Sequence, residues 1–472
     1  MENKATFKWR LNTLYEKMPV CGELRRPLLE FNPAYEAWRG GGSIVVPVIG
    51  ALAAGWLTQR AGRRVCIFVG VLMMTIAQLI AGVTGIVALF TVAMSLHRAG
   101  MLIALQGTLL QTVESVPAAR RGVLMALAGV CYAVGGVTSS YLDFALTKNQ
   151  WSWGFRLSLL LGMWPALIIL GVTPWIPESP VSLLQRDRLH DARQALQALR
   201  GELADVHEEY ECVKQAVLEV KGRATWSLLR ERSSRPSLLI SLALGALAAL
   251  TGPALLLDPT TSMFRPSADH PEDMYFYLYL MPGLMELAGT LLAMALIDSR
   301  VGRRGLLTYS ALATCLLATS TACVLGRTQD LWSREGPRSA VAALYYLMHV
   351  TKATGWWVCV YVVVTELLAL RARAIGLAVF LGAHFAFRDG LEAGLHYLRC
   401  PGRVYAFTVV AISAFIAAGF SHLMVPETRG VPLERVTADC VLPHWYWRRY
   451  APQPPAPPPQ QQAAGGRGAL PR

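Results

Sequence analysis

Long uncharged runs dominate the pattern of hydrophobic and polar positions along the chain. Val65–Phe90 contains no charged residue, and Val404–Pro426 contains none either. A helix needs about 20 apolar residues to cross the hydrocarbon core of a bilayer. The pattern therefore predicts eleven membrane-spanning helices, at 44–58, 65–90, 92–113, 123–146, 157–176, 236–257, 274–297, 305–325, 340–368, 374–398 and 404–425.

Two of the predicted spans are weaker than the others. The first is short and contains Pro47, whereas the run 374–398 contains Arg388, Asp389 and Glu392. Charged side chains are costly against lipid, so we expect these three to pair, to face the interior of the helix bundle or to lie near the membrane surface. Arg388 and Glu392 are four residues apart and can pair on one face of a helix.

Composition narrows the class of protein. The 472 residues are 54% hydrophobic and only 16% charged, whereas about a quarter of the residues in soluble domains are charged. This excludes a water-soluble enzyme. The net charge of +13 does not indicate a nucleic-acid partner, because the basic residues separate apolar runs as they do in cytoplasmic loops of membrane proteins. The nine cysteines include no CxxC pair and no zinc spacing, so we predict neither a metal site nor a cofactor.

Basic clusters orient the predicted helices. The positive-inside rule places these clusters in the cytoplasm: Arg60/Arg63/Arg64, Arg120/Arg121, Arg300/Arg303/Arg304, Arg371/Arg373 and the tail from Arg429. Counting spans back from them places the N-terminus outside. The first 43 residues contain no span and carry seven basic and five acidic residues. A basic segment outside conflicts with the same rule, so we expect that an earlier helix is missing.

A charged insert separates two hydrophobic halves. Within it, Leu189–Leu199 has helical periodicity and Glu202–Val220 is amphipathic. The residues from Ala451 onward are rich in Pro, Gln, Gly and Ala and cannot bury a core. We therefore predict a non-membrane segment at 1–43 that is the remnant of an outer lid, helical bundles at 44–176 and 236–427, a cytoplasmic helical insert at 177–235, and a cytoplasmic, largely disordered tail at 428–472.

Three motifs occur twice along the chain, in the same order and on the same predicted side of the membrane. Their offsets are nearly constant (302 − 62 = 240, 366 − 114 = 252, 427 − 178 = 249). They are Gly62-Arg63-Arg64 with Gly302-Arg303-Arg304, Glu114 and Arg121 with Glu366 and Arg373, and Pro177-Glu178-Ser179 with Pro426-Glu427-Thr428. This duplication predicts two parallel repeats related by an axis along the membrane normal.

The duplicated charges have two interpretations. Ion pairs between neighbouring helix ends would latch the two halves together in an outward-facing state and release them in an inward-facing one. Alternatively, the charges only orient the helices in the membrane. For the set as a whole we favour cytoplasmic gating by Arg63, Arg64, Glu114, Arg121, Glu178, Arg303, Arg304, Glu366, Arg373 and Glu427.

The motifs resemble those of the sugar porters of the major facilitator superfamily, and in particular the plant and algal sugar transport proteins, which are monosaccharide–proton symporters. The resemblance covers about residues 44–450. Its most specific pieces are Trp153–Ser158, Pro177–Pro180, Ser182–Arg186, Thr251-Gly252, Pro426–Pro432 and His444–Trp447. It implies an all-α multi-pass membrane protein with the major facilitator fold, two pseudo-symmetric helical bundles and about 11 of the family's 12 helices.

The same resemblance implies a function. The protein would carry monosaccharides (hexoses) by proton-coupled symport and alternating access, with sugar, protons and the lipid bilayer as its partners and the plasma membrane as its location. Two alternatives stay open. One is a non-transporting relative that acts as a sensor or partner subunit, and the other is a truncated product without activity.

The sequence departs from the family where members bind sugar and protons. Members carry a proton-accepting aspartate on helix 1 that faces an arginine on helix 4. That aspartate is absent here, and Arg98 is the only candidate for the arginine. The family's sugar contacts are mostly amides, since sugar hydroxyls both donate and accept hydrogen bonds. Only Gln106 matches, and the other positions read Gly129, Ala248, Ala249, Ala254, Glu286, Tyr361 and His384.

Four residues remain as candidates for substrate binding, and each has a second interpretation. Glu286 and His384 are ionisable at membrane depth. Either they couple protons together with Arg98, or they are substitutions without a function that are tolerated because the cavity holds water. Tyr361 either stacks on a sugar ring or packs in the core. Gln106 either lines the pocket or makes a hydrogen bond between helices. Lys352 either reaches the membrane surface or pairs.

One disulfide follows from the resemblance alone. Cys400 aligns with a cysteine at the outer end of helix 11 that, in the plant branch, bonds to a cysteine in an outer lid. Cys21 is the only candidate for its partner in this chain. An outside N-terminus would permit this bond.

Overall fold

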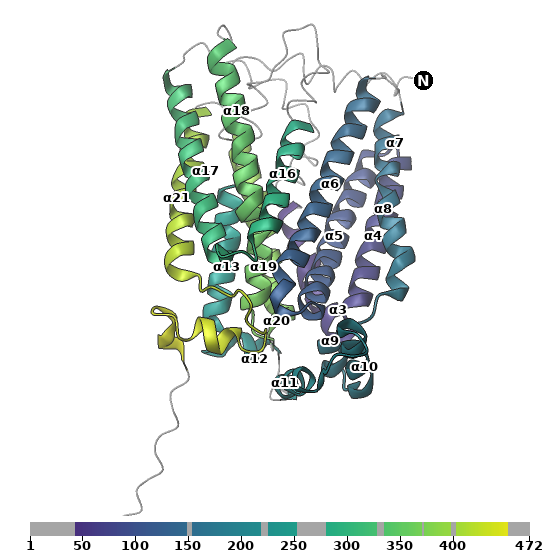
Figure 1. Ribbon diagram of the computed structural model, residues 1–472. Coiled ribbons are helices and arrows are strands. Elements are labelled where there is room, and N and C mark those ends of the chain that lie inside the picture. The colour runs from purple at the N-terminus through teal and green to yellow at the C-terminus, as the bar shows by residue number, and fades with distance from the viewer. Residues whose placement is uncertain are drawn as a thin grey trace, which may run out of the picture.

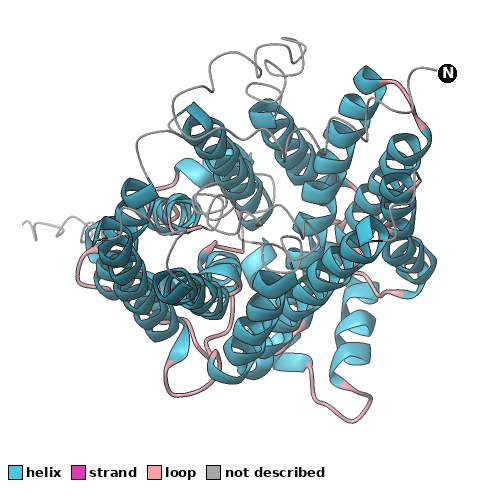
Figure 2. Ribbon diagram, turned by 90° about the horizontal axis from the view of Figure 1, so that it is seen from above, coloured by secondary structure: helices cyan, strands magenta, loops and turns pink. Residues whose placement is uncertain are grey.

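Two bundles of roughly parallel helices stand side by side and give the molecule its shape (Figure 1). The computed structural model describes residues 43–148, 153–218, 225–252, 280–327, 335–370, 372–397 and 403–451. The two cysteines of the predicted disulfide, Cys21 and Cys400, lie outside these residues, as do most of the predicted N-terminal segment and the end of the tail. Viewed along the helix axes, the described elements are helices joined by loops (Figure 2).

We call the two bundles the first lobe and the second lobe. The first lobe consists of α3 (Ser43–Arg60), α4 (Arg63–Val83), α5 (Val87–Ser115), α6 (Arg121–Lys148), α7 (Gly154–Leu161) and α8 (Met163–Val172). The second lobe consists of α13 (Arg235–Leu250), α16 (Met281–Leu296), α17 (Gly302–Arg327), α18 (Glu335–Lys352), α19 (Cys359–Leu367), α20 (Arg373–Tyr397) and α21 (Arg403–Met424).

All eleven predicted spans are helical over most of their described residues. Among the described residues, eight helices are long and apolar enough to cross a membrane, and α13 and α16 are shorter apolar helices. Large apolar side chains point outward from both lobes, for example Trp164 at 65% exposed, Ile168 at 61% and Phe415 at 66%. Apolar surface on this scale suits contact with lipid rather than water.

Three helix boundaries differ from the predicted spans. The run at 65–90 is divided, because α4 ends at Val83 and α5 begins at Val87. Hydropathy alone misses this turn, since the residues within it carry no charge. A second break at Gly162 separates α7 from α8. A π-helical turn, Ala353–Trp357, separates α18 from α19. At its Gly355 a Cβ would collide with the Ser310 hydroxyl, so only glycine allows this close packing against α17.

The two lobes meet along a shared apolar core. Helix α3 packs against α20, and α6 packs against α16. Buried side chains from both lobes form one continuous cluster at this boundary, including Leu102, Leu110, Leu244, Val364 and Leu381. The all-helical, two-bundle architecture predicted from the sequence is confirmed.

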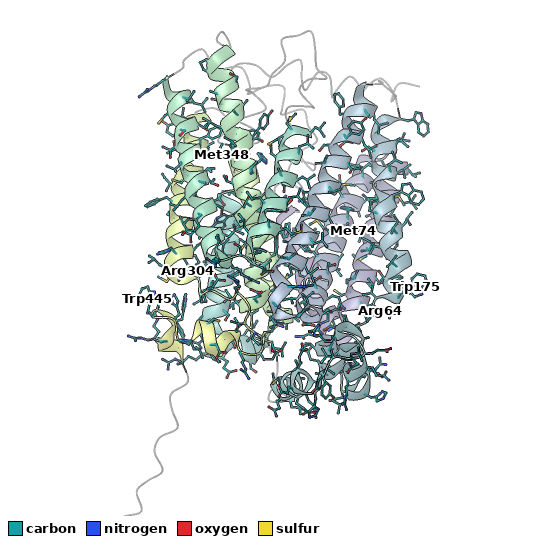
Figure 3. The ribbon with its side chains drawn as sticks, in the orientation of Figure 1. Arg64, Met74, Trp175, Arg304, Met348 and Trp445 are labelled. Carbon is teal, nitrogen blue, oxygen red and sulfur yellow. The ribbon has the colours of Figure 1, made fainter. Side chains whose placement is uncertain are left out.

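Both lobes carry their arginine pairs at the same end of the molecule. Figure 3 shows Arg64 and Arg304 near the same end of the two bundles, and we call this end the basic end. Trp175 and Trp445 lie near it as well. Arginine and tryptophan together are typical of the border between membrane and water. This placement agrees with parallel repeats, whereas the predicted orientation in the membrane stays a prediction.

The insert folds into short helices below the basic end (Figure 1). They are α9 (Pro180–Gln185), α10 (Leu189–Arg200), α11 (His207–Leu218) and α12 (Thr225–Arg230). The first predicted helix is confirmed as α10, whereas the second begins at His207 rather than Glu202. Leu183, Leu196 and Tyr210 form a small core with Leu370, which belongs to the second lobe. The insert therefore lies against both halves of the molecule.

The segment after α21 closes the basic end of that helix. The indole of Trp445 donates to the carbonyl of Leu423 at 3.2 Å, and the indole of Trp447 donates to the carbonyl of Met424 at 2.7 Å. The last carbonyls of a helix lack partners within the helix, so these indoles satisfy them. Beside them, partial burial and the nearby Arg304 lower the pKa of His444.

Candidate functional site

Four side chains join the helix ends at the basic end of the first lobe. The guanidinium of Arg63 contacts the carboxylate of Glu114 at 3.0 Å, and the Ser179 hydroxyl donates to the other oxygen of Glu114. The Glu178 carboxylate accepts from the backbone N–H of Arg63 at 2.7 Å and of Arg64 at 3.3 Å. The first N–H groups of a helix lack partners within the helix and favour a negative charge. Glu178 therefore caps α4.

The second lobe repeats this arrangement contact for contact. The Arg303 guanidinium contacts the Glu366 carboxylate at 3.3 Å, and the Thr428 hydroxyl donates to the other oxygen of Glu366 at 2.6 Å. The Glu427 carboxylate accepts from the backbone N–H of Arg303 at 3.1 Å and of Arg304 at 3.0 Å. The Gly-Arg-Arg, glutamate and Pro-Glu-Ser/Thr duplicates thus make the same contacts within both lobes.

This geometry explains why each Gly-Arg-Arg motif begins with glycine. Gly62 has a φ of +99° and Gly302 a φ of +69°, which residues with a side chain rarely adopt. A Cβ at Gly62 would lie 2.7 Å from a carboxylate oxygen of Glu178, and one at Gly302 would lie 2.5 Å from Glu427. Glycine therefore lets the capping carboxylate approach the start of the helix.

The contacts that cross between the lobes at the basic end are not duplicated. Arg121 of the first lobe lies 3.7 Å from Glu366 of the second and donates to the carbonyl of Val431 at 3.2 Å. Its counterpart Arg373 donates from Nε to the carbonyl of Leu368 at 3.1 Å. The two terminal nitrogens of Arg373 are buried without a hydrogen-bond partner. The predicted latch is therefore one cross-lobe pair, while the other close Glu–Arg contacts of the duplicated set lie within a lobe.

Two further hydrogen bonds hold the lobes together at this end. The Gln106 amide on α5 donates to the carbonyl of Ala374 on α20 at 2.9 Å. The backbone N–H of Val123 on α6 donates to the Asp298 carboxylate at 2.8 Å, and Asp298 also contacts Arg303 at 2.7 Å. Gln106 is fully buried, so of its two interpretations the structure favours the bond between helices.

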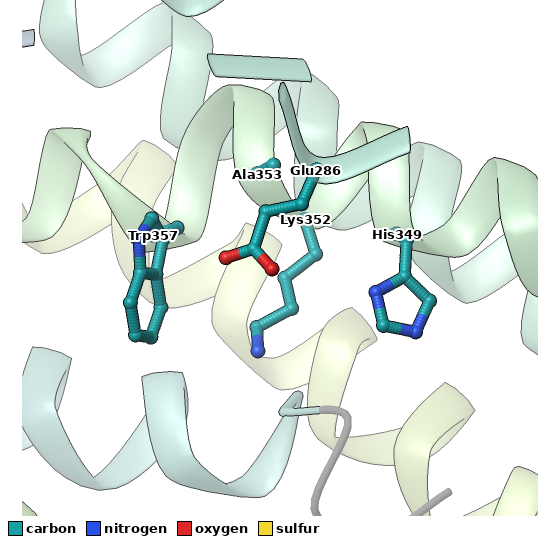
Figure 4. Close-up of a pocket in the computed structure, with 5 residues that line it drawn as sticks. All are labelled: Glu286, His349, Lys352, Ala353 and Trp357. Atoms are coloured by element: carbon teal, nitrogen blue, oxygen red, sulfur yellow. The ribbon is translucent and has the colours of Figure 1, made fainter. Parts of the chain in front are cut away.

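A small cavity deeper in the second lobe contains ionisable side chains. It is lined by Glu286 of α16, His349 and Lys352 of α18, and Ala353 and Trp357 of the π-helical turn. The Glu286 and Lys352 side chains extend into the same space, with Trp357 on one side and His349 on the other (Figure 4). The Lys352 ammonium lies 5.5 Å from the centre of the Trp357 ring, a cation–π distance.

Aromatic rings continue from this cavity toward the boundary between the lobes. The ring centres of Trp357 and Tyr361 are 6.4 Å apart, and those of Tyr361 and His384 are 6.2 Å apart. The His384 ring stacks on Phe380 and its Nδ1 lies 2.8 Å from the carbonyl of Gly245. From the first lobe, the Tyr132 ring comes within 5.1 Å of Trp357. These rings offer flat faces and polar edges at the centre of the molecule.

The predicted site residues separate into three places. Tyr361 and His384 lie together in the aromatic group, and Glu286 lies in the cavity with Lys352. Arg98 lies apart from both and pairs with Asp389 at 3.0 Å. Among the described residues, no hydrogen bond or ion pair joins Glu286 to His384, so a proton relay between these two stays a prediction without a direct contact.

Sequence reasoning missed the partners of four residues. It named no partner for Lys352 or for Asp389. It also did not predict that the hydroxyls of Ser179 and Thr428 donate to the duplicated glutamates. A signal existed for Lys352, because an uninterrupted apolar run with one lysine requires a local counter-charge. No comparable signal pairs Arg98 with Asp389, which are 291 residues apart.

The chain is similar in sequence to sugar transport proteins. The family described as "Sugar (and other) transporter" matches residues 41–439. Sugar transport protein MST8 of Oryza sativa subsp. japonica is 27% identical over 409 residues, which are 85% of this chain and 79% of that protein. Sugar transport protein 1 of Arabidopsis thaliana is 24% identical over 417 residues, covering 85% and 78%.

Solved structures of a bacterial transporter share the fold. A structure of the proton:xylose symporter XylE bound to 6-bromo-6-deoxy-D-glucose superposes with a TM-score of 0.76 at 18% identity, covering 92% of this chain and 95% of that one. A structure titled as the inward open conformation of XylE from E. coli gives 0.60 at 19% identity, covering 86% and 88%. The chain therefore has the major facilitator fold, in an arrangement more similar to the first structure.

Proposed function

Because the chain belongs to the sugar transporter family of the major facilitator superfamily, we propose that it carries hexoses together with protons across the plasma membrane. It is a multi-pass integral membrane protein of a family of transporters rather than enzymes. In this proposal the bundles predicted at 44–176 and 236–427 alternately open a central site to either side. The insert at 177–235 and the segment from residue 428 lie on the cytoplasmic side.

The observation that carries the proposal is the pair of charged side chains, Glu286 and Lys352, which line one water-sized space in the second lobe. A sugar hydroxyl both donates and accepts hydrogen bonds. A carboxylate can only accept and an ammonium can only donate, so the two side chains together replace the amide of a typical sugar site. Hydrogen bonds to charged groups are stronger than those between neutral groups. Trp357 beside the cavity and Tyr361 beyond it supply ring faces for the apolar side of a sugar.

Proton coupling rests on the ionisable residues at membrane depth. Glu286 and His384 are the candidates to exchange a proton, and Arg98, which lies apart from both and pairs with Asp389, is the third predicted member. Such residues are rare in membrane helices and mark pathways for substrates or ions. A structural neighbour described as a proton:xylose symporter supports this assignment. In the present arrangement the cross-lobe contacts of Arg121 and Gln106 hold the basic end closed.

Uptake into proteoliposomes tests the proposal. Purified protein is reconstituted, an inward proton gradient is imposed, and entry of labelled glucose is followed with and without a protonophore. We expect saturable uptake that the protonophore reduces to the rate of facilitated entry. Glu286→Gln should remove the dependence on the gradient, and Lys352→Gln should raise the KM for glucose by about 10-fold or more, as expected for loss of a hydrogen bond to a charged group.

A matched control separates these effects from general damage. Ser320 lies on the exposed side of α17, and its hydroxyl bonds only to the carbonyl of Leu316 in the same helix. Ser320→Ala should leave uptake and its gradient dependence unchanged. Gradient dependence that survives in Glu286→Gln would exclude Glu286 as the coupling residue. Absence of saturable uptake for every hexose and pentose would contradict the transport proposal itself.

One observation favours a second function, that of a sensor or partner subunit that binds sugar without moving it. Ala248 and Ala249 stand where the family resemblance implies paired glutamines, and both are buried. Each lost amide leaves a sugar hydroxyl without a partner and costs about 1–3 kcal/mol. Saturable binding of glucose to the purified protein, together with no uptake in proteoliposomes, would select this function over transport.

A further inference from the structure

An ion pair joins the two lobes far from the basic end. The Arg98 guanidinium on α5 of the first lobe lies 3.0 Å from the Asp389 carboxylate on α20 of the second lobe. The Asp389 side chain is 8% exposed and that of Arg98 is 44% exposed. Two ion pairs between described residues cross the lobe boundary, and the other is Arg121 with Glu366.

The two cross-lobe pairs lie at different depths. Arg98 precedes Glu114 by 16 residues (114 − 98), and Asp389 follows Arg373 by 16 residues (389 − 373). At 1.5 Å per residue, both lie about 24 Å along their helices from the charges of the basic end. The hydrocarbon core of a bilayer is about 30 Å thick, so the pair lies beyond the middle of the membrane.

Movement of the lobes must change this pair. In a transporter whose halves separate first at one end and then at the other, a contact beyond the middle opens when the end opposite the basic end opens. Two charges that are separated at membrane depth lose their partners, and breaking a buried pair is strongly unfavourable. The pair therefore favours arrangements in which α5 and α20 stay together at this depth.

We infer that Arg98 and Asp389 form the lock that holds the lobes together on the side opposite the basic end. This inference rests on the proposed function, because a lock matters only if the lobes move. It assigns both residues to gating, complementary to Arg121 and Glu366 at the basic end. Opening the opposite end then requires Asp389 to lose its contact with Arg98.

Other charges near the pair come mainly from α20 itself. The Arg388 Nε lies 3.8 Å from Asp389, and its guanidinium also lies over the Phe385 ring at 5.5 Å. His384, one turn earlier, bonds to the carbonyl of Gly245. The neighbouring helix α3 has no ionisable residue except Arg60 at its basic end. Arg98 supplies the charge from the other lobe in this ion pair.

A distance measurement tests the lock without requiring transport. Tyr141 on α6 and Tyr405 on α21 are exposed, at 57% and 68%, and lie toward the end opposite the basic end. Spin labels are attached to cysteines at these two positions, with the native cysteines replaced, and the distance distribution is measured by pulsed electron resonance in lipid. Asp389→Asn should shift the distribution to longer distances, and Arg98→Gln should do the same.

Restoration and control variants complete the test. The charge-exchanged double variant, Arg98→Asp with Asp389→Arg, should return the distribution toward that of the unmodified protein. Thr314→Val removes a 3.0 Å hydrogen bond to Thr351 within the second lobe, so it should leave the distribution unchanged. Arg98→Gln alters the more exposed partner, so it provides the test if Asp389→Asn does not fold.

The outcomes separate the lock from the transport proposal. Longer distances in the neutralised variants, with restoration in the exchanged one, support the lock. An unchanged distribution in both neutralised variants overturns it, whatever uptake shows. A clear distance response in a protein that takes up no sugar leaves the lock in place and contradicts transport instead.

Discussion

The two lobes carry the same charged cluster at the basic end but differ in how they use it across their boundary. Glu366 of the second lobe binds Arg303 and Thr428 within its lobe and Arg121 of the first lobe. Glu114 of the first lobe binds its own Arg63 and Ser179, while the terminal nitrogens of Arg373 in the second lobe have no hydrogen-bond partner. Duplication preserved the contacts inside each lobe but only one of the two bonds between them.

The difference has a physical reason. Contacts within a lobe satisfy needs that exist in every state of the protein, namely a buried arginine and the free N–H groups at a helix start. Contacts between lobes must form and break, so they need only shift the equilibrium between states that are open and closed at the basic end. At the basic end, a single cross-lobe ion pair with a few hydrogen bonds is enough for that purpose.

The largest effect should follow from removing the shared carboxylate. Glu366→Gln leaves the buried Arg121 without its carboxylate partner and leaves Arg303 with Asp298 alone, and we expect a loss of about 3–5 kcal/mol of stability. Glu114→Gln should cost a similar amount, because Arg63 then has no carboxylate. Thermal unfolding in detergent measures both losses. Only Glu366→Gln should also loosen the lobes at the basic end. Unchanged stability in Glu366→Gln would contradict the assigned pairing.

The equivalent arginines Arg121 and Arg373 test the difference between the lobes most directly. Arg121→Gln removes a charge-assisted contact between lobes worth about 1.5–3 kcal/mol, and should shift the protein toward states open at the basic end. Arg373→Gln removes a guanidinium whose terminal nitrogens have no hydrogen-bond partner. It should therefore increase the population of states open at the basic end much less. The accessibility of a cysteine introduced beside the insert reports the opening. Equal shifts in the two variants would show that the lobes are not asymmetric.

The hydroxyls that hold the two glutamates should have equal, smaller effects. Ser179→Ala and Thr428→Val each remove one hydrogen bond to a buried carboxylate, and we expect each to cost about 1–3 kcal/mol. Ser179→Ala also removes a long bond, 3.4 Å, that this hydroxyl accepts from the backbone N–H of Ser182. Their similarity is the prediction, because these contacts lie within the lobes and are duplicated. A difference of several-fold between the two unfolding free energies would argue against a common role.

The smallest effect should come from an exposed pair in the insert. Arg188 and Asp191 are 60% and 38% exposed and lie 2.6 Å apart. Exposed pairs contribute about 0–1 kcal/mol, so Asp191→Asn should change neither stability nor uptake measurably. A loss as large as that in Glu366→Gln would show that the unfolding assay does not distinguish buried from exposed charges.

The sequence predicted the fold well because membrane helices follow from local composition. Largely apolar runs located all eleven described helical regions, and the duplicated Gly-Arg-Arg and Glu motifs predicted two equivalent lobes. Turns without charge, such as the one between Val83 and Val87, were missed because hydropathy does not distinguish them from helix. Within the amphipathic segment Glu202–Val220 the helix α11 covers His207–Leu218, since periodicity does not mark a helix end sharply.

The site was less predictable because it depends on contacts between distant segments. The resemblance singled out Glu286, Tyr361 and His384, but it did not show that Glu286 lies beside Lys352 rather than His384. The pairing of Arg98 with Asp389 depends on how α5 meets α20. Such pairs follow from tertiary packing, which one sequence does not specify residue by residue.

Counterflow of a labelled hexose in proteoliposomes tests the central claim, that two lobes expose one sugar site alternately to the two sides. Vesicles are loaded with unlabelled glucose and diluted into labelled glucose at a low concentration. Alternating access predicts a transient accumulation of labelled glucose inside the vesicles above its outside concentration. The reason is that a site that has released labelled glucose inside returns outward carrying mostly unlabelled glucose, so label enters faster than it leaves. Simple equilibration without an overshoot, in protein that is inserted and folded, would contradict the account.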